Sequence, residues 1–214
     1  MSSVGQVPQE ARAPGEPSSS PPAAIRWVRQ RRPLLTALFV VAVLVVALLD
    51  GRPAADVLHP SAAAAFWLPW LLAVVGVWVR IWGAGNLRKN QEITRTGVYQ
   101  MVRHPLYLGS LLMFLAFFIA VGDPWVGAGL WLAMVVLVYY PTMMDEEAHL
   151  AGLFPEQTAE YRHLPRLVPN LFRLPVALRT DRFTFRAAYA NYGMRSLWFL
   201  PLLPVLLELL RRVE

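Results

Sequence analysis

The chain has 214 residues, of which 56% are hydrophobic and only 16% are charged, with a formal net charge of +6 and no cysteine. A typical soluble domain has about 25% charged residues, so this composition indicates an integral membrane protein. The basic residues lie between apolar runs, which argues against binding to nucleic acid. The lack of cysteine excludes disulfides, thiolate zinc sites and a cysteine nucleophile.

The amino-terminal part of the chain predicts a tail followed by a membrane helix. Residues 1–24 are rich in Pro, Ser, Ala and Gly. They bury too little surface to offset their ordering entropy, so we expect a disordered tail. Four arginines precede the uncharged run over 34–49, which predicts a first transmembrane helix. A cleavable signal peptide is less consistent with this long apolar core and the poor cleavage site that follows it.

Three more apolar runs follow along the chain. The run over 62–82 has tryptophans near both ends, as at membrane boundaries, and predicts a second transmembrane helix that ends in residues 83–86. The runs over 106–121 and 125–144 are separated only by Gly122-Asp123-Pro124. So short a connection predicts an antiparallel helical hairpin.

The carboxyl-terminal part predicts further helices. A helix over 145–161 is expected to continue out of the fourth apolar run. Asp181 is a candidate N-cap for an amphipathic helix that reaches Tyr192. The last apolar run, 197–210, contains two prolines and Glu208. It is compatible with a short tilted span, a re-entrant segment or an interfacial helix.

The distribution of basic residues predicts the orientation of the protein. They flank the first run, follow the second run and follow the fourth run. The positive-inside rule therefore puts the amino terminus, the loop over 83–104 and the segment over 145–196 in the cytoplasm. We expect an all-α, polytopic integral membrane protein of about four to five transmembrane helices, in the plasma (inner) membrane with its active site facing the cytoplasm. The expected units are a tail (1–24), two transmembrane helices (25–82), a core (83–170), and an amphipathic helix with a short membrane segment (171–214).

The first candidate motif begins with Thr96-Gly97-Val98-Tyr99 and continues as Arg103-His104-Pro105-Leu106-Tyr107-Leu108-Gly109. Charged and imidazole groups next to an apolar span are costly, which makes them candidates for a functional site. A capped helix start with a snorkelling Arg103 explains the arginine and the proline, but not the other polar residues beside them. His104 and Tyr107 share one face of the first helical turn, where backbone N–H groups also favour a carboxylate.

The second candidate motif is the acidic pair Glu146-Glu147 at the end of the fourth apolar run. The helix macrodipole disfavours carboxylates at a carboxyl-terminal end, so we expect a compensating cation, for which Arg103 is the natural candidate. Glu146 and His149 also form one Glu-x-x-His pair, but a di-iron site needs two such pairs, and no metal site is expected. The chain has no nucleophile elbow and no glycine-rich dinucleotide fingerprint.

Together these blocks resemble a known superfamily. The pattern Thr-Gly-Val-Tyr, Arg-His-Pro-x-Tyr-x-Gly, an apolar hairpin, Glu-Glu-x-x-Leu-x-x-x-Phe, then Tyr161 and Pro165-Arg166-Leu167-Val168-Pro169 is similar to the isoprenylcysteine carboxyl methyltransferase and phospholipid methyltransferase superfamily. The similarity covers residues 90–170. It implies an S-adenosylmethionine-dependent methyltransferase that acts on a lipid-like or apolar small molecule, with membrane lipid around it.

The resemblance also implies which residues form the site. The candidate cofactor-binding residues are Tyr99, Arg103, His104, Pro105, Leu106, Tyr107, Gly109, Glu146, Glu147 and Tyr161. As catalytic residues we expect Arg166, which would orient an anionic acceptor, and Glu147; either Glu146 or Glu147 would take a proton from an amine acceptor.

Several acceptors remain open. Isoprenylcysteine-type carboxyl methylation is the most similar reaction, although Tyr140-Pro141-Thr142-Met143-Met144 lacks the arginine that eukaryotic members place before the acidic pair. Phospholipid N-methylation and small-thiol S-methylation are alternatives in the same superfamily. An NADPH-dependent sterol-type membrane reductase, which has a similar Arg-His-Pro block, is the alternative outside it.

Overall fold

The computed structural model describes residues 22–51, 54–56, 58, 64–89 and 91–213; most of the expected tail lies outside these residues. The described chain is helical and contains no strand. Its helices are α1 (Ala23–Asp50), α2 (Ala64–Asn86), η1 (Gly97–Gln100), α3 (Pro105–Ala120), α4 (Pro124–Met134), η2 (Val135–Tyr139), α5 (Tyr140–Leu153), α6 (Pro155–Tyr161), η3 (Leu171–Arg173), α7 (Leu174–Arg179), α8 (Phe185–Ala190), η4 (Gly193–Trp198) and α9 (Phe199–Val213).

Four helical stretches among the described residues are long and apolar enough to cross a membrane: Ala23–Asp50, Phe66–Asn86, Pro124–Leu153 and Gly193–Arg212. A shorter apolar helix, α3, accompanies them. The predicted all-α, polytopic membrane fold is therefore confirmed. The last apolar run belongs to a helical stretch of full membrane length, because η4 leads directly into α9.

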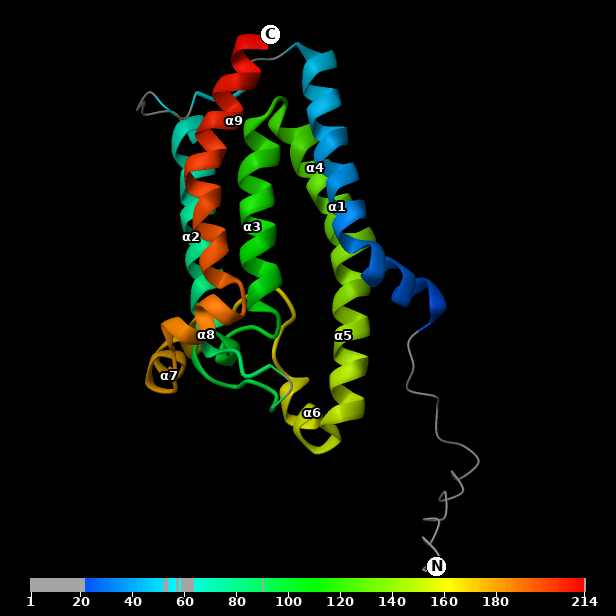
Figure 1. Ribbon diagram of the computed structural model, residues 1–214, viewed down its shortest axis with the longest axis vertical. Coiled ribbons are helices and arrows are strands. Elements are labelled where there is room, and N and C mark those ends of the chain that lie inside the picture. The colour runs from blue at the N-terminus through cyan, green and yellow to red at the C-terminus, as the bar shows by residue number, and fades with distance from the viewer. Residues whose placement is uncertain (1–21, 52–53, 57, 59–63, 90, 214) are drawn as a thin grey trace, which may run out of the picture.

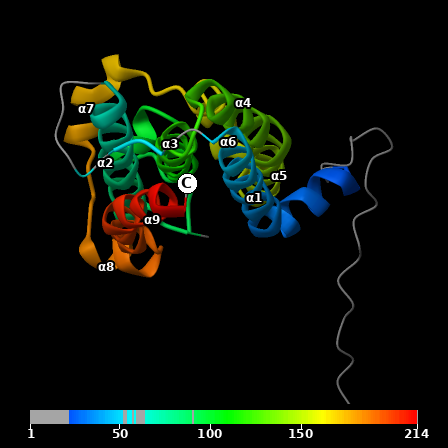
Figure 2. The ribbon, with the colours of Figure 1, turned by 90° about the horizontal axis from the view of Figure 1, so that it is seen from above.

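The long helices form a bundle around α3 (Figures 1 and 2). Helices α2 and α9 lie on one side of α3, and α4, α5 and α1 lie on the other. At one end of the bundle α2 and α5 end and α3 begins; we call this the site end. The short helices α6, α7 and α8 lie there, whereas the carboxyl terminus lies at the opposite end.

Small residues allow the helices around α3 to approach closely. A side chain on Gly76 of α2 would meet the backbone oxygen of Gly109 of α3, and one on Gly109 would meet Gly76 and Arg80. On the other side of α3, a side chain on Gly127 of α4 would overlap the backbone of Phe118. Such close contacts are a common way to hold helices together in a membrane, where the hydrophobic effect between helices is weak.

The predicted hairpin is confirmed. Helix α3 ends at Ala120 and α4 begins at Pro124. The side chain of Asp123 accepts hydrogen bonds from the backbone N–H groups of Trp125 and Val126, at 2.8 and 3.2 Å. Asp123 is therefore an N-cap, and Pro124 occupies the first helical position, where no N–H is needed.

Helix α2 ends at Asn86, the last residue of the stretch over 83–86 where the sequence predicted its end. The small residues there face close neighbours: Gly83 lies against Pro105, and Gly85 lies against the ring of Phe183. Tertiary packing is a second reason for the small side chains, beside their place at the end of the helix.

The hairpin's second helix is continuous over Pro124–Leu153 but contains a π-turn at η2. The N–H of Tyr140 donates to the carbonyl of Val135, five residues earlier. Pro141, which follows, has no N–H to donate, and its ring would clash with the preceding turn of a regular α-helix. The wider turn relieves this clash.

The helix predicted over 145–161 is interrupted. Helix α5 ends at Leu153, and α6 begins two residues later at Pro155. Phe154 adopts φ −136° and ψ 64°. A residue before proline is disfavoured in the helical region, which explains the break.

The prediction that Asp181 caps a helix to Tyr192 is wrong. Helix α8 begins at Phe185, and its N-cap is Thr184, whose hydroxyl accepts from the N–H of Ala187 at 3.2 Å. Asp181 instead accepts hydrogen bonds from the side chains of Trp82 and Asn86 at the end of α2, at 3.1 and 2.7 Å.

The close contact between α2 and α3 predicts a stability effect. We expect Gly76→Ala to lower the thermal midpoint of the purified protein in detergent, since overpacking a tight contact typically costs about 1–3 kcal/mol. Gly129→Ala on α4 is the control, because nothing lies within 4 Å of an added side chain there. An unchanged midpoint for Gly76→Ala would contradict the tight contact.

Candidate active site

Two segments far apart in the sequence run together at the site end. The backbone N–H groups of Arg103 and His104 donate to the carbonyls of Pro165 and Arg166, at 2.9 and 3.2 Å. This pairing fixes the start of α3 against the proline-containing segment over 165–169. It places the side chains of Arg103, His104 and Arg166 around one point, to which α5 contributes an acid.

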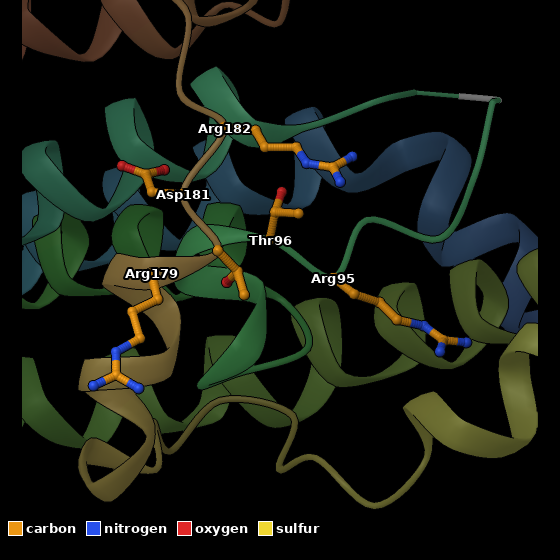
Figure 3. A pocket seen from close by; sticks show the side chains of 6 residues that line it. Arg95, Thr96, Arg179, Asp181 and Arg182 are labelled. Carbon is orange, nitrogen blue, oxygen red and sulfur yellow. The ribbon is translucent and has the colours of Figure 1, made fainter.

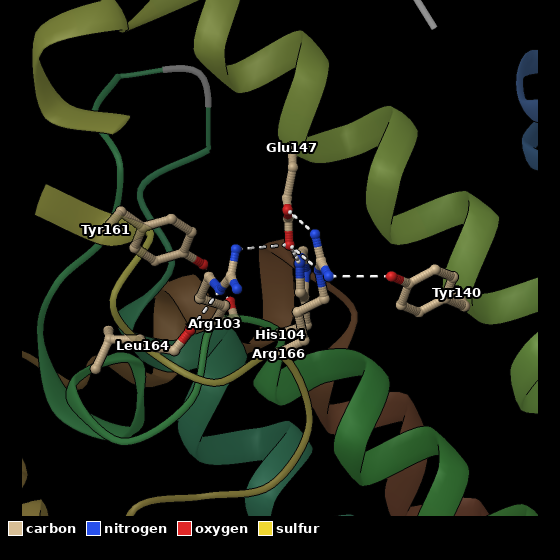
Figure 4. A network of polar contacts seen from close by, with 7 residues as sticks. All are labelled: Arg103, His104, Tyr140, Glu147, Tyr161, Leu164 and Arg166. Atoms are coloured by element: carbon tan, nitrogen blue, oxygen red, sulfur yellow. Dashed lines mark hydrogen bonds and ion pairs between the residues drawn. The ribbon is translucent and has the colours of Figure 1, made fainter. Parts of the chain in front are cut away.

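That acid is Glu147, which three basic side chains surround (Figure 4). Arg166 donates from Nε to Oε1 at 2.9 Å and from Nη2 to Oε2 at 3.0 Å. Arg103 Nη1 lies 3.1 Å and His104 Nε2 lies 2.9 Å from Oε1. The expected contact between Arg103 and the acidic pair is confirmed. We call these four residues the Glu147 cluster.

Neighbouring groups hold the basic side chains in place. The hydroxyl of Tyr161 donates to the backbone carbonyl of Arg103, and Arg103 Nε donates to the carbonyl of Leu164 at 2.6 Å. Arg166 Nη1 donates to the hydroxyl of Tyr140 at 3.2 Å, and its guanidinium lies 5.2 Å from the centre of that ring. Donors on both arginines are thus directed by fixed acceptors, which limits their motion.

The pKa values of Arg166, Tyr161 and Tyr99 are shifted by this arrangement. Hydrogen bonds to Glu147 raise the pKa of the Arg166 guanidinium. Burial, and then the nearby carboxylates, raise the pKa of Tyr161 well above its usual range. Burial likewise raises the pKa of Tyr99, which is 6% exposed. Both phenols therefore stay neutral at physiological pH and act as hydrogen-bond donors rather than as bases.

Tyr107 extends the site from the Glu147 cluster into the bundle. Its ring lies 5.6 Å from that of His104 and 5.8 Å from that of Tyr139, measured between centroids. Its hydroxyl accepts a hydrogen bond from Arg32 of α1 at 3.0 Å and also interacts with the carboxylate of Glu146. The two predicted motifs and α1 therefore meet at Tyr107.

Helix α1 contributes residues that the sequence reasoning treated only as an orientation signal. Arg29 forms an ion pair at 2.8 Å with Asp145, whose side chain is 3% exposed. Arg32 reaches Tyr107. The available signal was the spacing of these two arginines, which places them three residues apart on one face of a helix.

Arg80 is a second residue that sequence reasoning missed. It lies in α2, inside an apolar run, and its Nη1 donates to the carbonyl of Leu106 at 3.3 Å and to the hydroxyl of Ser110. An ionisable side chain inside a membrane span is by default a candidate for function, so its position alone was a usable signal.

Three of the predicted cofactor-binding residues face α2. Pro105 and Leu106 lie against Gly83, and Gly109 lies against Gly76 and Arg80. Helix packing accounts for these contacts, and binding of a cofactor by these three residues stays a prediction. The described residues contain no group of three or more side chains suited to hold a metal ion.

A separate pocket of about 460 Å³ lies at the site end, between the loop after α2 and the loop after α7 (Figure 3). Three arginines line it, and their guanidinium groups point in different directions. No residue of the Glu147 cluster contributes to it. The lining residues are Arg95, Thr96, Arg179, Thr180, Asp181 and Arg182.

Comparisons with known proteins give the family. The family model described as phospholipid methyltransferase matches residues 63–157. The nickel-cobalt-cadmium resistance protein NccN of Alcaligenes xylosoxydans xylosoxydans is 31% identical over 167 residues, which are 75% of each chain. The cobalt-zinc-cadmium resistance protein CzcN of Cupriavidus metallidurans is 33% identical over 134 residues, which are 61% of this chain and 59% of CzcN.

No solved structure matches the chain. The matched family region contains the Arg-His-Pro block, the hairpin and the acidic pair, and the match to NccN extends over three quarters of both proteins. The chain therefore belongs to the phospholipid methyltransferase family, within the superfamily of membrane methyltransferases similar to isoprenylcysteine carboxyl methyltransferase.

Proposed function

We propose that the protein is an S-adenosylmethionine-dependent methyltransferase that acts at the membrane on a lipid-like or apolar acceptor, most like isoprenylcysteine carboxyl methylation. The observation that carries this proposal is the Glu147 cluster. Three motif blocks that are separated in the sequence converge on one carboxylate, at the end of a bundle of apolar helices.

The chemistry of the side chains fits this cofactor. When bound, S-adenosylmethionine supplies an electrophilic methyl group on a positively charged sulfur. Glu146 offers a carboxylate for a positive group, and the rings of Tyr107 and Tyr139 offer faces that attract cations. The phenol of Tyr99 stays protonated and is a candidate donor for a ribose or carboxylate oxygen, whereas the O–H of Tyr161 already donates to the carbonyl of Arg103.

The geometry favours different roles for the two acids. Both oxygens of Glu147 already accept hydrogen bonds from Arg166, so we assign it a positioning role for Arg166 and His104. Glu146 interacts with Tyr107 and is the better base for an amine acceptor. A carboxylate or thiolate acceptor needs no base, and in that case positioning with water excluded supplies the acceleration.

We place the site end in the cytoplasm, in the plasma (inner) membrane. The loop after α2 and the segment after α5 lie at this end and carry most of the chain's basic residues. The positive-inside rule assigns such an end to the cytoplasm. S-adenosylmethionine would then enter from the aqueous side and the apolar acceptor from the bilayer.

The first prediction concerns cofactor binding. We expect His104→Ala and Glu147→Gln to weaken binding of S-adenosylmethionine at least tenfold, because each change breaks a charge-assisted contact in the cluster. Isothermal titration calorimetry of the purified protein in detergent measures this. His149→Ala and Glu156→Gln, at exposed positions of α5 and α6, are matched controls. A folded wild-type protein that binds no cofactor would refute the proposed function.

The second prediction concerns the acceptor. Incubation with radiolabelled S-adenosylmethionine and the organism's total lipid and small-molecule extract should label an apolar product. Release of the label by alkali identifies an ester, whereas a stable label identifies N- or S-methylation. For an anionic acceptor, we expect Arg166→Lys to raise KM about tenfold with little change in kcat, since lysine lacks the planar fork. A fall in kcat alone would exclude an acceptor-orienting role for Arg166.

A further inference from the structure

Arg80 carries a positive charge within the bundle. It lies six residues before the end of α2, which corresponds to about 9 Å along the helix axis. Its described hydrogen-bond partners are the carbonyl of Leu106 and the hydroxyl of Ser110, both uncharged. Its Nε atom is buried and has no hydrogen-bond partner. The neutral acceptors therefore pair with only some of the N–H donors of the Arg80 guanidinium.

A second guanidinium lies nearby. Arg32 donates to the hydroxyl of Tyr107, and its guanidinium lies 5.3 Å from the centre of that ring. Arg32 and Arg80 are close enough to repel each other electrostatically, and the other groups acting on Arg80 are the phenols of Tyr139 and Tyr99 rather than a carboxylate. None of the ion pairs between described residues includes Arg32 or Arg80.

This arrangement is costly unless an anion completes it. Glu147 binds Arg103 and Arg166, and Asp145 binds Arg29. The remaining acid nearby, Glu146, contacts the hydroxyl of Tyr107 and forms none of the ion pairs between described residues. Two neighbouring guanidiniums inside a membrane bundle repel each other and lose solvation. Hydroxyl groups of Tyr107, Tyr139, Ser110 and Thr36 surround this locus, and they supply dipoles but no negative charge.

We propose that Arg32 and Arg80 form a binding site for the carboxylate group of a ligand of this enzyme. A guanidinium binds a carboxylate through parallel N–H donors, and two guanidiniums from different helices fix its position. The proposal rests on the proposed function, because the hydroxyl of Tyr107 contacts both Arg32 and the carboxylate of Glu146. The carboxylate belongs either to the amino-acid end of S-adenosylmethionine or to the acidic head of an apolar acceptor.

Four probes separate these two sources. S-adenosylhomocysteine carries the amino-acid carboxylate, and 5′-methylthioadenosine is a related nucleoside thioether without it. Decanoate is an apolar carboxylate, and decanol is its neutral counterpart. Binding of each probe is measured by calorimetry on the full chain in a nonionic detergent, for the wild type, Arg32→Gln and Arg80→Gln. Arg31→Gln is the matched control, since this exposed arginine neighbours Arg32 and its guanidinium lies over the ring of Trp27.

The outcomes are distinct. If the cofactor supplies the carboxylate, both variants bind S-adenosylhomocysteine at least tenfold more weakly, because a charge-assisted hydrogen bond is lost. Their affinity for 5′-methylthioadenosine, which has no carboxylate, does not change. If the acceptor supplies it, they lose binding of decanoate but not of decanol. Folding is checked by the thermal midpoint; Arg32→Gln, at a half-exposed position, carries the test if Arg80→Gln does not fold.

Failure of the proposal differs from failure of the proposed function. The carboxylate site is refuted if both carboxylate probes bind unchanged to two folded variants. These are Arg32→Gln and a variant of Arg80, either Arg80→Gln or Arg80→Lys. A wild type that binds decanoate through these arginines but no S-adenosylhomocysteine keeps the carboxylate site and refutes the methyltransferase. A wild type that binds neither probe overturns both.

Discussion

The arrangement of the site end depends on the carboxylate of Glu147. It is the shared acceptor for the start of α3, through Arg103 and His104, and for the proline-containing segment, through Arg166. These contacts are partly buried, with the Glu147 side chain 18% exposed, so they are stronger than the same contacts in water. Without this acid, the guanidiniums of Arg103 and Arg166 would repel each other where they now meet.

Different interactions hold the bundle together at different positions along its length. Away from the site end, apolar side chains and close glycine contacts hold the helices together without polar groups exposed to lipid. At the site end, ion pairs and hydrogen bonds to loop carbonyls take over. Arg32 and Arg80 lie where these two regions meet, which is why partly satisfied charge is found there.

The sequence predicts contacts that arise from local rules and misses those that arise from packing. The hairpin followed from a three-residue connection, and the contact of Arg103 with Glu147 followed from a carboxylate at a helix carboxyl terminus. The end of α2 near Asn86 followed from its glycines, but the packing of Gly85 on Phe183 did not, because these two residues lie about 100 positions apart in the chain. Asp181 looked like a cap for the same reason: its actual donors, Trp82 and Asn86, are distant in the sequence.

The site residues of α1 and α2 were missed for a different reason. Arg32 lies in a basic flank, a pattern that the positive-inside rule explains without any further role. Arg80 lies alone in an apolar run, and a snorkelling arginine has the same appearance in sequence. Only the three-dimensional structure shows that both guanidiniums lie near the phenol of Tyr139.

The π-turn at η2 determines the direction, around the helix axis, in which each later side chain of the same helix points. An α-helix advances about 100° per residue, so one additional residue in a turn redirects every later side chain by about that angle. The directions in which Asp145 reaches Arg29 and Glu147 reaches Arg166 therefore include the wider turn at Val135–Tyr139. The site is thus positioned by a count of residues in a segment that has no polar side chain except that of Tyr139.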